Sequence, residues 1–224
     1  MLLQRSVIRS GLWVLPISGV IWIIGSPLRG DLPDPNVSAV SFMTAIAAPS
    51  FFWGVCINLG GLLLATFGFI ALWAYLTESN SSRVALGGML LTVLGQEMIL
   101  SFYGIFLLVL PLLGRMYTQN GIGADVSVAV LTNPSFVVVY LLSGLAYVSG
   151  SLLLSVALWQ GTSFPKWVAV CFSLSSVVLC AGPLLQVPVP LSNVLGSLLL
   201  IASGGWIAWR AKGIHFSILI KGIT

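Results

Sequence analysis

Charged residues are scarce in this sequence. Only 6% of the 224 residues are Asp, Glu, Lys or Arg, whereas 58% are hydrophobic, and the mean hydropathy is +1.09. A soluble domain carries about 25% charged residues, so the composition excludes a soluble domain of ordinary type. It predicts an all-α protein whose residues 1–224 form one transmembrane helix bundle, with the lipid bilayer as its surroundings.

Motifs that carry common chemistries are also missing. The sequence has no glycine-rich phosphate loop, no His-Glu-x-x-His and no cluster with metal-ligand spacing. Its three cysteines, Cys56, Cys171 and Cys180, lie in apolar runs without Cys-x-x-Cys spacing, and we interpret them as small buried residues. The single histidine, His215, argues against a haem held by two histidines. We therefore expect no metal and no cofactor held by this chain alone.

Two specialised membrane chemistries are excluded in the same way. Intramembrane serine proteolysis needs a nucleophilic serine paired with a membrane histidine, and His215 lies beyond the last long apolar run. A retinal Schiff base needs a lysine, and no lysine falls in the middle of an apolar run. The chain therefore lacks the reactive residue that each of these functions requires.

Long apolar runs are abundant, and a membrane-spanning helix needs roughly 20 apolar residues. The runs predict six spanning helices, at about 11–26, 51–76, 84–112, 135–159, 167–185 and 193–209. The long loops at 26–49 and 114–134 each contain an apolar piece, 37–48 and 125–131, that is too short to span. We expect these pieces to form two short interfacial helices on the outer face, the first of them capped by Asn36.

The basic residues gather on one side of this predicted topology. The side that holds both termini and the two short turns has seven basic residues, and the other side has two. Because basic residues favour the cytoplasmic side of a membrane, we expect both termini to be cytoplasmic. The net charge of +4 then reflects topology and not nucleic-acid binding. The seven are Arg5, Arg9, Arg83, Lys166, Arg210, Lys212 and Lys221, and the two are Arg29 and Arg115.

One acid, Glu97, falls inside a membrane-length apolar run, near the midpoint of 84–112. An acid at that depth costs about 2.5–3.5 kcal/mol on insertion scales and by default suggests a functional site. No Lys or Arg lies at a similar depth, and burial without a cation disfavours the ionised form. We therefore expect Glu97 to be protonated at pH 7 and to donate a hydrogen bond, either as a tentative catalytic acid or simply as a packed polar group.

Polar residues recur at helical spacing around this acid. Ser101 and Gly104 share the face of Glu97, and we expect that face to pack against other helices rather than against lipid. Gln96 and Tyr103 belong to an adjacent stripe, and a second polar seam follows the predicted helix at 135–159. The residues expected to line a ligand pocket are Asn58, Gln96, Ser101, Tyr103, Tyr140, Ser143 and Tyr147.

The sequence also has a family likeness that spans most of the chain, with its motifs in the second half. Its segments 150–158 (GSLLLSVAL), 164–167 (FPKW) and 204–209 (GGWIAW) resemble a bacterial multi-helix integral membrane family catalogued as a domain of unknown function. That family has a similar length, long outer loops and a Pro-basic-Trp turn before its fifth helix. The resemblance implies a bacterial plasma-membrane, multi-pass protein, and it implies neither a reaction nor a catalytic residue.

The residues leave several functions open, and whether the chain is an enzyme is one of the open points. The leading hypothesis is a non-catalytic accessory or scaffold subunit of a larger membrane complex, because no reactive cluster is present. A second is an integral membrane enzyme or binder of an apolar, lipid or isoprenoid-like molecule that uses protonated Glu97. A third is a small proton-coupled transporter. A partner complex that places pigment or haem against Glu97, Gln96 or His215 is also compatible with the sequence.

Overall fold

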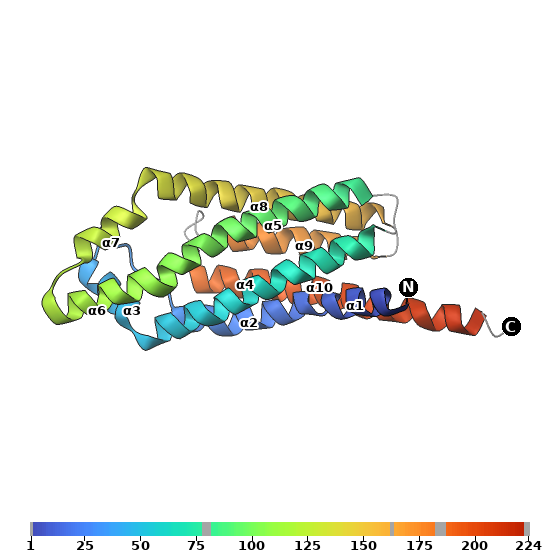
Figure 1. Cartoon of the computed structure of the whole chain (residues 1–224), viewed down its shortest axis with the longest axis horizontal. Coiled ribbons are helices and arrows are strands. Elements are labelled where there is room, and N and C mark those ends of the chain that lie inside the picture. The colour runs from blue at the N-terminus through green and yellow to red at the C-terminus, as the bar shows by residue number, and fades with distance from the viewer. Residues whose placement is uncertain (1, 78–81, 162–163, 182–186, 222–224) are drawn as a thin grey trace.

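The computed structural model describes residues 2–77, 82–161, 164–181 and 187–221, and every regular element within these ranges is a helix (Figure 1). The all-α prediction is therefore confirmed for this part of the chain. The elements in chain order are α1 (Leu2–Leu12), α2 (Val14–Arg29), α3 (Ala39–Ala47), α4 (Pro49–Leu76), α5 (Ser82–Gly104), the π-helical turn η1 (Ile105–Val109), α6 (Leu110–Asn120), α7 (Ala124–Leu131), α8 (Pro134–Gln160), α9 (Lys166–Ala181) and α10 (Val189–Lys221).

Five helices in the described ranges are long and apolar enough to cross a membrane, as expected of a multi-pass membrane protein. They are Ser6–Arg29, Pro49–Leu76, Ser82–Asn120, Pro134–Gln160 and Val189–Ala211. The segment predicted as a further span, 167–185, forms the shorter helix α9 of 16 residues. Its expected end, 182–185, lies outside the described residues.

The long helices run along one common axis, and both termini lie at the same end of the bundle (Figure 1). We call this the terminal end. The opposite end, the cap end, carries the short helices α3, α6 and α7 (Figure 1). The two pieces expected as short helices are confirmed as helices, because 37–48 contains α3 and 125–131 lies within α7. Ser38, and not Asn36, caps α3, since its hydroxyl accepts a hydrogen bond from the Ser41 amide at 3.3 Å.

The third long helix extends farther than the prediction of 84–112. Helices α5, η1 and α6 are continuous from Ser82 to Asn120, so residues 114–120, which were expected in a loop, are helical. A helix of 39 residues at ~1.5 Å per residue is about 58 Å long, whereas the hydrocarbon core is ~30 Å thick. The helix is therefore longer than the membrane is thick, and its last part, α6 (Leu110–Asn120), lies at the cap end. Helix α6 packs closely against α3, because an added Cβ at Gly114 would lie 2.7 Å from the Ala47 amide nitrogen.

Glycines bring the helices together in two close pairs. On α4, an added Cβ at Gly68 would lie 2.7 Å from the Leu15 side chain of α2. On α5, an added Cβ at Gly88 would lie 2.8 Å from the Leu154 amide nitrogen of α8. Small residues that allow backbones to approach are the usual basis of helix association in membranes. The bundle is therefore built around the pairs α2–α4 and α5–α8, with α9 and α10 packed alongside them.

Candidate functional site

A cavity of about 750 Å³ lies between these helices in the half of the bundle nearer the cap end. Along α8 its lining runs from Phe136 to Val148, which is about 18 Å at ~1.5 Å per residue. Its walls come from α2, α4, α5, η1, α7, α8, α9 and α10, and they are mainly apolar and aromatic. Ligand sites for small molecules typically enclose about 300–1,000 Å³, so the cavity has the size of a binding site.

The deep end of the cavity lies where α5 crosses α8. An added Cβ at Gly95 would lie 2.8 Å from the Tyr147 Cα atom, so the two backbones nearly touch. This crossing brings Gln96 of α5 beside Tyr147 and Ser143 of α8 in the cavity lining. The Gln96 amide oxygen accepts a hydrogen bond from the Thr66 hydroxyl at 3.1 Å, which fixes the orientation of the amide.

Aromatic rings close this deep end. The Tyr147 ring packs edge-on against Phe69 of α4, with ring centroids 6.1 Å apart. Phe69 in turn packs against Phe172 of α9, at 5.8 Å. Each of these contacts joins different helices, and all three residues belong to the core of the terminal half. The cavity therefore ends near the middle of α8 at these three packed rings, which we call the aromatic plug.

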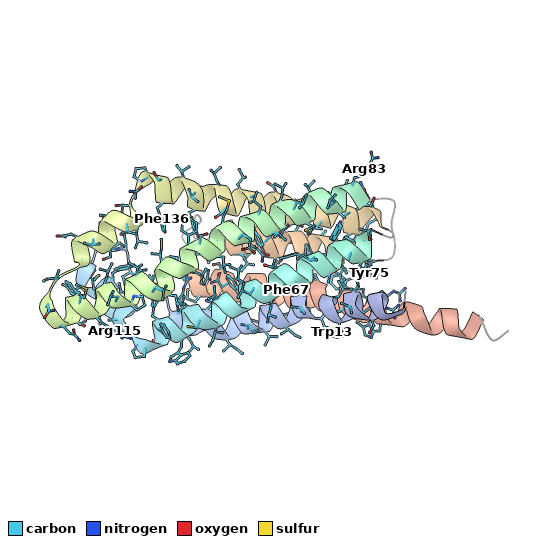
Figure 2. The ribbon with its side chains drawn as sticks, viewed as in Figure 1. Trp13, Phe67, Tyr75, Arg83, Arg115 and Phe136 are labelled. Carbon is cyan, nitrogen blue, oxygen red and sulfur yellow. The ribbon has the colours of Figure 1, made fainter. Side chains whose placement is uncertain are left out.

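A second set of aromatic side chains forms the wall nearer the cap end. The Phe102 ring of α5 lies 4.7 Å from Phe136 and 5.7 Å from Tyr140, both on α8. Figure 2 shows Phe136 close to the start of α8. On the opposite side, Tyr103 lies 6.5 Å from the Trp22 ring of α2. The cavity thus has aromatic residues on both sides, which suits an apolar chain or ring.

Arg29 is the one cation among the described residues that lines the cavity, and it lies near the cap end. It is the last residue of α2, and its backbone is held against α4, because an added Cβ at Gly54 would lie 2.6 Å from the Arg29 Cα atom. The Nε atom of Arg29 is buried and has no hydrogen-bond partner. Its guanidinium interacts electrostatically with the Tyr103 hydroxyl. The exposed Asp31 lines the same end of the cavity.

Helix α10 completes the wall opposite α8. The Asn193 amide nitrogen donates a hydrogen bond to the Ser26 hydroxyl of α2 at 3.1 Å, in a buried position. Asn193 and Ser197 both line the cavity. These groups add a few fixed polar contacts to a largely apolar surface, which is the usual composition of a ligand pocket.

The cavity unites most of the residues that were expected to line a pocket. Five of the seven do so: Gln96, Tyr103, Tyr140, Ser143 and Tyr147. Asn58 does not, because it is fully buried between α4 and α2, where its Oδ1 and Nδ2 atoms have no hydrogen-bond partner and its side chain packs against Gly25. Ser101 does not either, because it lies on the exposed face of α5 and donates to the Glu97 carbonyl at 3.2 Å.

Glu97 itself lies outside the cavity, and its side chain is exposed on the surface of α5. Gly104, on the same face as Ser101, is exposed too. The expectation that this face packs against other helices of the bundle is therefore wrong. The reason is geometric, since consecutive residues point about 100° apart on a helix and Gln96 takes the inward position. Glu97 keeps its depth, two residues along α5 from the crossing of Gly95 with the middle of α8.

Arg29 is the residue of this site that sequence reasoning missed. We interpreted it as a topology signal, because it follows an apolar run and precedes a proline-rich loop. The available signal was its rarity, since it is one of only two basic residues on its side of the predicted topology. The inward aromatic residues Phe102 and Phe136 carried no signal, because an aromatic residue in an apolar run is usually part of a core.

Other site chemistries find no support in the described ranges. Within them, no group of three or more His, Cys, Asp and Glu side chains is placed to bind a metal ion. Cys56, Cys171 and Cys180 are free thiols, and Cys180 lines the cavity. The side chain of His215, which was considered as an axial ligand, lies outside the described residues. The cavity and its lining are therefore the basis for any functional argument.

Comparison of the chain with known protein families, with curated proteins and with solved structures finds no match in any of the three.

Proposed function

We propose that this chain is a multi-pass membrane protein that binds one amphipathic, lipid-like molecule in the cavity between α2, α5, α8 and α10. The cavity is the observation that carries the proposal. It encloses about 750 Å³, it is walled by aromatic and aliphatic side chains, and it has a cation at one end and neutral polar groups at the other. A few fixed polar groups in an apolar pocket orient a ligand that is itself mostly apolar.

The proposal includes a topology. We place both termini in the cytoplasm, because the terminal end carries seven of the nine basic residues. The cap end with α3 and α7 then lies at the outer interface of the membrane. The short helix α9 packs against α8 and α10, and the proposal assigns it to a sixth span. The family resemblance supports a bacterial plasma membrane as the location.

The cavity is aligned as a lipid of the outer leaflet would be aligned. Its lining begins near the cap end and stops at the aromatic plug beside Tyr147, so it covers about 18 Å of bundle length by helical rise. This is roughly half of a ~30 Å hydrocarbon core. A lipid can therefore keep its polar head near the interface and its chain toward the membrane centre when it enters.

Filling the cavity tests the proposal. Gly144 lines the cavity on α8, and an added Cβ there meets no atom within 4 Å. Gly144→Phe should fill the space without displacing neighbours and should remove a co-purifying lipid from the protein. Gly60→Phe is the matched control, since Gly60 also has open space but lies outside the cavity. Intact-complex mass analysis of gently extracted protein measures the bound lipid.

The expected result is a bound lipid in the wild type and in Gly60→Phe, and its loss in Gly144→Phe. Equal lipid occupancy in all three proteins would overturn the proposal. An enzymatic role for Glu97 toward the bound molecule receives no support, because Glu97 does not line the cavity. A proton-coupled transporter stays a prediction, and Asp31 is the one acid of the described residues that lines the cavity.

A second candidate function is that of an accessory subunit, and the exposed Glu97 favours it. The outward face of α5 carries Leu90, Leu94, Glu97, Ser101 and Gly104. A carboxyl group in lipid is costly, and a polar residue beside small residues is typical of a helix–helix interface in membranes. We propose that this face packs against a helix of another membrane protein that carries a hydrogen-bonding side chain at the same depth.

Two substitutions at this position distinguish the alternatives. Glu97→Gln keeps the volume and the hydrogen-bonding ability, whereas Glu97→Leu keeps a similar volume and removes the hydrogen-bonding ability. Extraction from the native membrane should retain a stoichiometric partner with Glu97→Gln and lose it with Glu97→Leu. Retention by both variants, or a wild-type chain that is always alone, would contradict the accessory role. A partner that proves to be a second copy of this chain would also contradict it and would make the protein a homo-oligomer.

A further inference from the structure

We propose that Arg29 binds an anionic head group, a carboxylate or a phosphate, of the molecule held in the cavity. This inference rests on the proposed lipid-binding function and specifies the chemical class of its ligand. The juxtaposition that carries it is a half-buried guanidinium group, with its Nε atom buried and without a hydrogen-bond partner, at the end of a cavity whose walls are mainly aromatic and aliphatic.

The first argument is the unmet bonding capacity of the Arg29 side chain. An arginine carries five N–H donors in a planar fork and stays charged in proteins. The Nε atom of Arg29 is buried without a hydrogen-bond partner. A buried unsatisfied donor of a charged group is costly and calls for an explanation. An oxyanion in the cavity would accept from this fork and remove the cost.

The second argument is the neighbouring donor. The hydroxyl of Tyr103 lies within electrostatic reach of the guanidinium, and its ring lines the cavity. A phenol can donate to the same anion that the guanidinium binds. Arginine and carboxylate or phosphate groups form paired, charge-assisted hydrogen bonds. The geometry thus provides two kinds of donor for one anionic group.

The third argument is that the position of Arg29 is fixed by the fold. Gly54 of α4 allows the backbone of α2 to approach, and an added Cβ there would lie 2.8 Å from the Gly25 carbonyl oxygen and 2.6 Å from the Arg29 Cα atom. The side chain therefore starts from a rigid crossing and not from a loop. Preorganised charge of this kind favours binding, because little ordering is needed when the ligand arrives.

Arg29 also has an ordinary structural role available, which is to neutralise the carboxyl end of the α2 dipole. That role does not need a side chain that lines the cavity. The Gly30 amide donates to the Ser26 carbonyl at 3.1 Å, so one carbonyl of the last turn is already satisfied by the backbone. A long basic side chain at a membrane interface normally extends its charge into water, whereas the Nε atom of Arg29 is buried.

The charge of Asp31 opposes an anion at the same end of the cavity, but Asp31 differs from Arg29 in its surroundings. Asp31 is exposed, whereas Arg29 is half-buried. Solvent screens the exposed carboxylate more strongly than the half-buried guanidinium. Inside the cavity, the attraction of an anion to Arg29 therefore outweighs its repulsion by Asp31, which lies at the exposed rim.

Three probes with one common chain test this inference: oleate, oleyl phosphate and oleyl alcohol. They differ only in the head group, so the chain contributes equally to each affinity. Wild-type protein in detergent or nanodiscs should bind both anions at least about tenfold more tightly than the alcohol, as expected for charge-assisted hydrogen bonds. Binding of only one anion also supports the inference and identifies the head group as carboxylate or phosphate.

Variants of Arg29 provide the second measurement. Arg29→Gln should weaken binding of the anionic probes by about tenfold and leave oleyl alcohol within about twofold. Arg115→Gln is the matched control, because Arg115 is an exposed cation of the same end of the bundle (Figure 2) and does not line the cavity. Arg29→Lys keeps the charge but loses the planar fork, so its affinity for the anionic probes should lie between those of wild type and Arg29→Gln.

The outcomes separate failure of the inference from failure of the proposed function. If all three probes bind the wild type equally and Gly144→Phe weakens all of them, the cavity binds lipid but Arg29 does not select an anion. If no probe binds and Gly144→Phe changes nothing, the proposed function itself fails. If Arg29→Gln does not fold, the comparison of anionic and neutral probes on wild-type protein still decides the inference.

Discussion

The two halves of the bundle are built from the same helices, yet the interior between the helix pairs is filled in one half and contains a large cavity in the other. In the terminal half, a core joins the pair α2–α4 to the pair α5–α8, and Phe69, Tyr147 and Phe172 lie where this core meets the cavity. In the cap half, a cavity of about 750 Å³ lies between α8 and the helices α2 and α10, while a second core that includes Val55, Leu62 and Tyr103 still joins α4 to α5. The pair α2–α4 stays close there, since an added Cβ at Gly54 would lie 2.6 Å from the Arg29 Cα atom, whereas α5 meets α8 there through aromatic rings, with Phe102 against Phe136 and Tyr140.

This contrast shows how a membrane bundle can be both rigid and hollow. Without a strong hydrophobic force between helices in lipid, close packing of small residues holds each pair together. Gly54 and Gly68 on α4, and Gly88 and Gly95 on α5, meet backbone or core atoms of the partner helix. Gly144, by contrast, faces open space in the cavity. The close contacts of these four glycines therefore lie outside the lining of the cavity.

The largest effect is expected from removing the aromatic plug. Phe172→Ala should lower the free energy of unfolding by about 2 kcal/mol or more, because the Phe172 ring packs α9 against α4 and its loss leaves a void in the core. Phe172 is 1% exposed. Phe136→Ala should cost less than about 1 kcal/mol, since Phe136 already borders a cavity and can be replaced by lipid. Thermal or denaturant unfolding of the two variants in one detergent gives the comparison, and equal losses would refute it.

A smaller but sharper effect is expected within the pair α5–α8. Gly88→Ala should destabilise the protein by about 1–3 kcal/mol, because the new methyl group would overlap the backbone of α8. Its Cβ would lie 2.8 Å from the Leu154 amide nitrogen and 2.9 Å from the Gly150 carbonyl oxygen. Gly87→Ala is the control on the adjacent residue, where an added Cβ meets no atom within 4 Å. Denaturation midpoints for the two variants should differ clearly, and coinciding midpoints would contradict the close crossing.

The helical architecture could be predicted from the sequence because it depends on local properties. Apolar run length gave the long helices, and the short helices α3 and α7 followed from runs too short to span. Continuation of α5 through η1 to Asn120 was missed, because the apolar run ends near residue 112 and a loop was expected from residue 114. Pro111 falls near the start of α6, where its missing amide proton is tolerated across the π-helical turn.

The site could be predicted only in part because it depends on how the helices are rotated. Gln96 and Glu97 are adjacent, and polarity alone does not say which of them faces inward. The crossing at Gly95 decides it, since it brings Gln96 to the cavity and leaves Glu97 outside. Arg29 was missed for a related reason, because a basic residue after an apolar run is normally a topology signal. Only the fold shows that it lines the cavity.

A favourable substitution is expected in the cap half. Gly144→Ala should stabilise the protein by up to about 1 kcal/mol, because alanine has the higher helix propensity and nothing obstructs its methyl group. An added Cβ at this position meets no atom within 4 Å. The expected change in stability is therefore opposite in sign to that of Gly88→Ala on α5. Thermal unfolding without added lipid measures the effect, and a loss of stability at Gly144 would mean that the cap half closes onto this residue.

The smallest effect concerns the rim of the cavity. If Arg29 holds an anionic head group, the carboxylate of Asp31 at the same end repels it, although solvent weakens the repulsion because Asp31 is exposed. Asp31→Asn should therefore raise the affinity for oleate by about two- to threefold, the size typical of exposed charge interactions. Affinity for oleyl alcohol should not change. The gain should shrink as salt is added, because salt shortens the Debye length, which is about 8 Å at physiological ionic strength, and so weakens interactions of exposed charges.

Titration of both probes at low and high salt checks the prediction for Asp31. A gain for oleate that persists at high salt would indicate that the substitution reshapes the rim instead of removing a charge. A loss of oleate affinity would place the carboxylate on the binding side, as the acceptor that orients the Arg29 fork. That result would sharpen the difference between the two ends of the cavity. Ligand binding at the cap end would then depend on a charged pair, whereas binding at the deep end depends on neutral groups such as Gln96 and Tyr147.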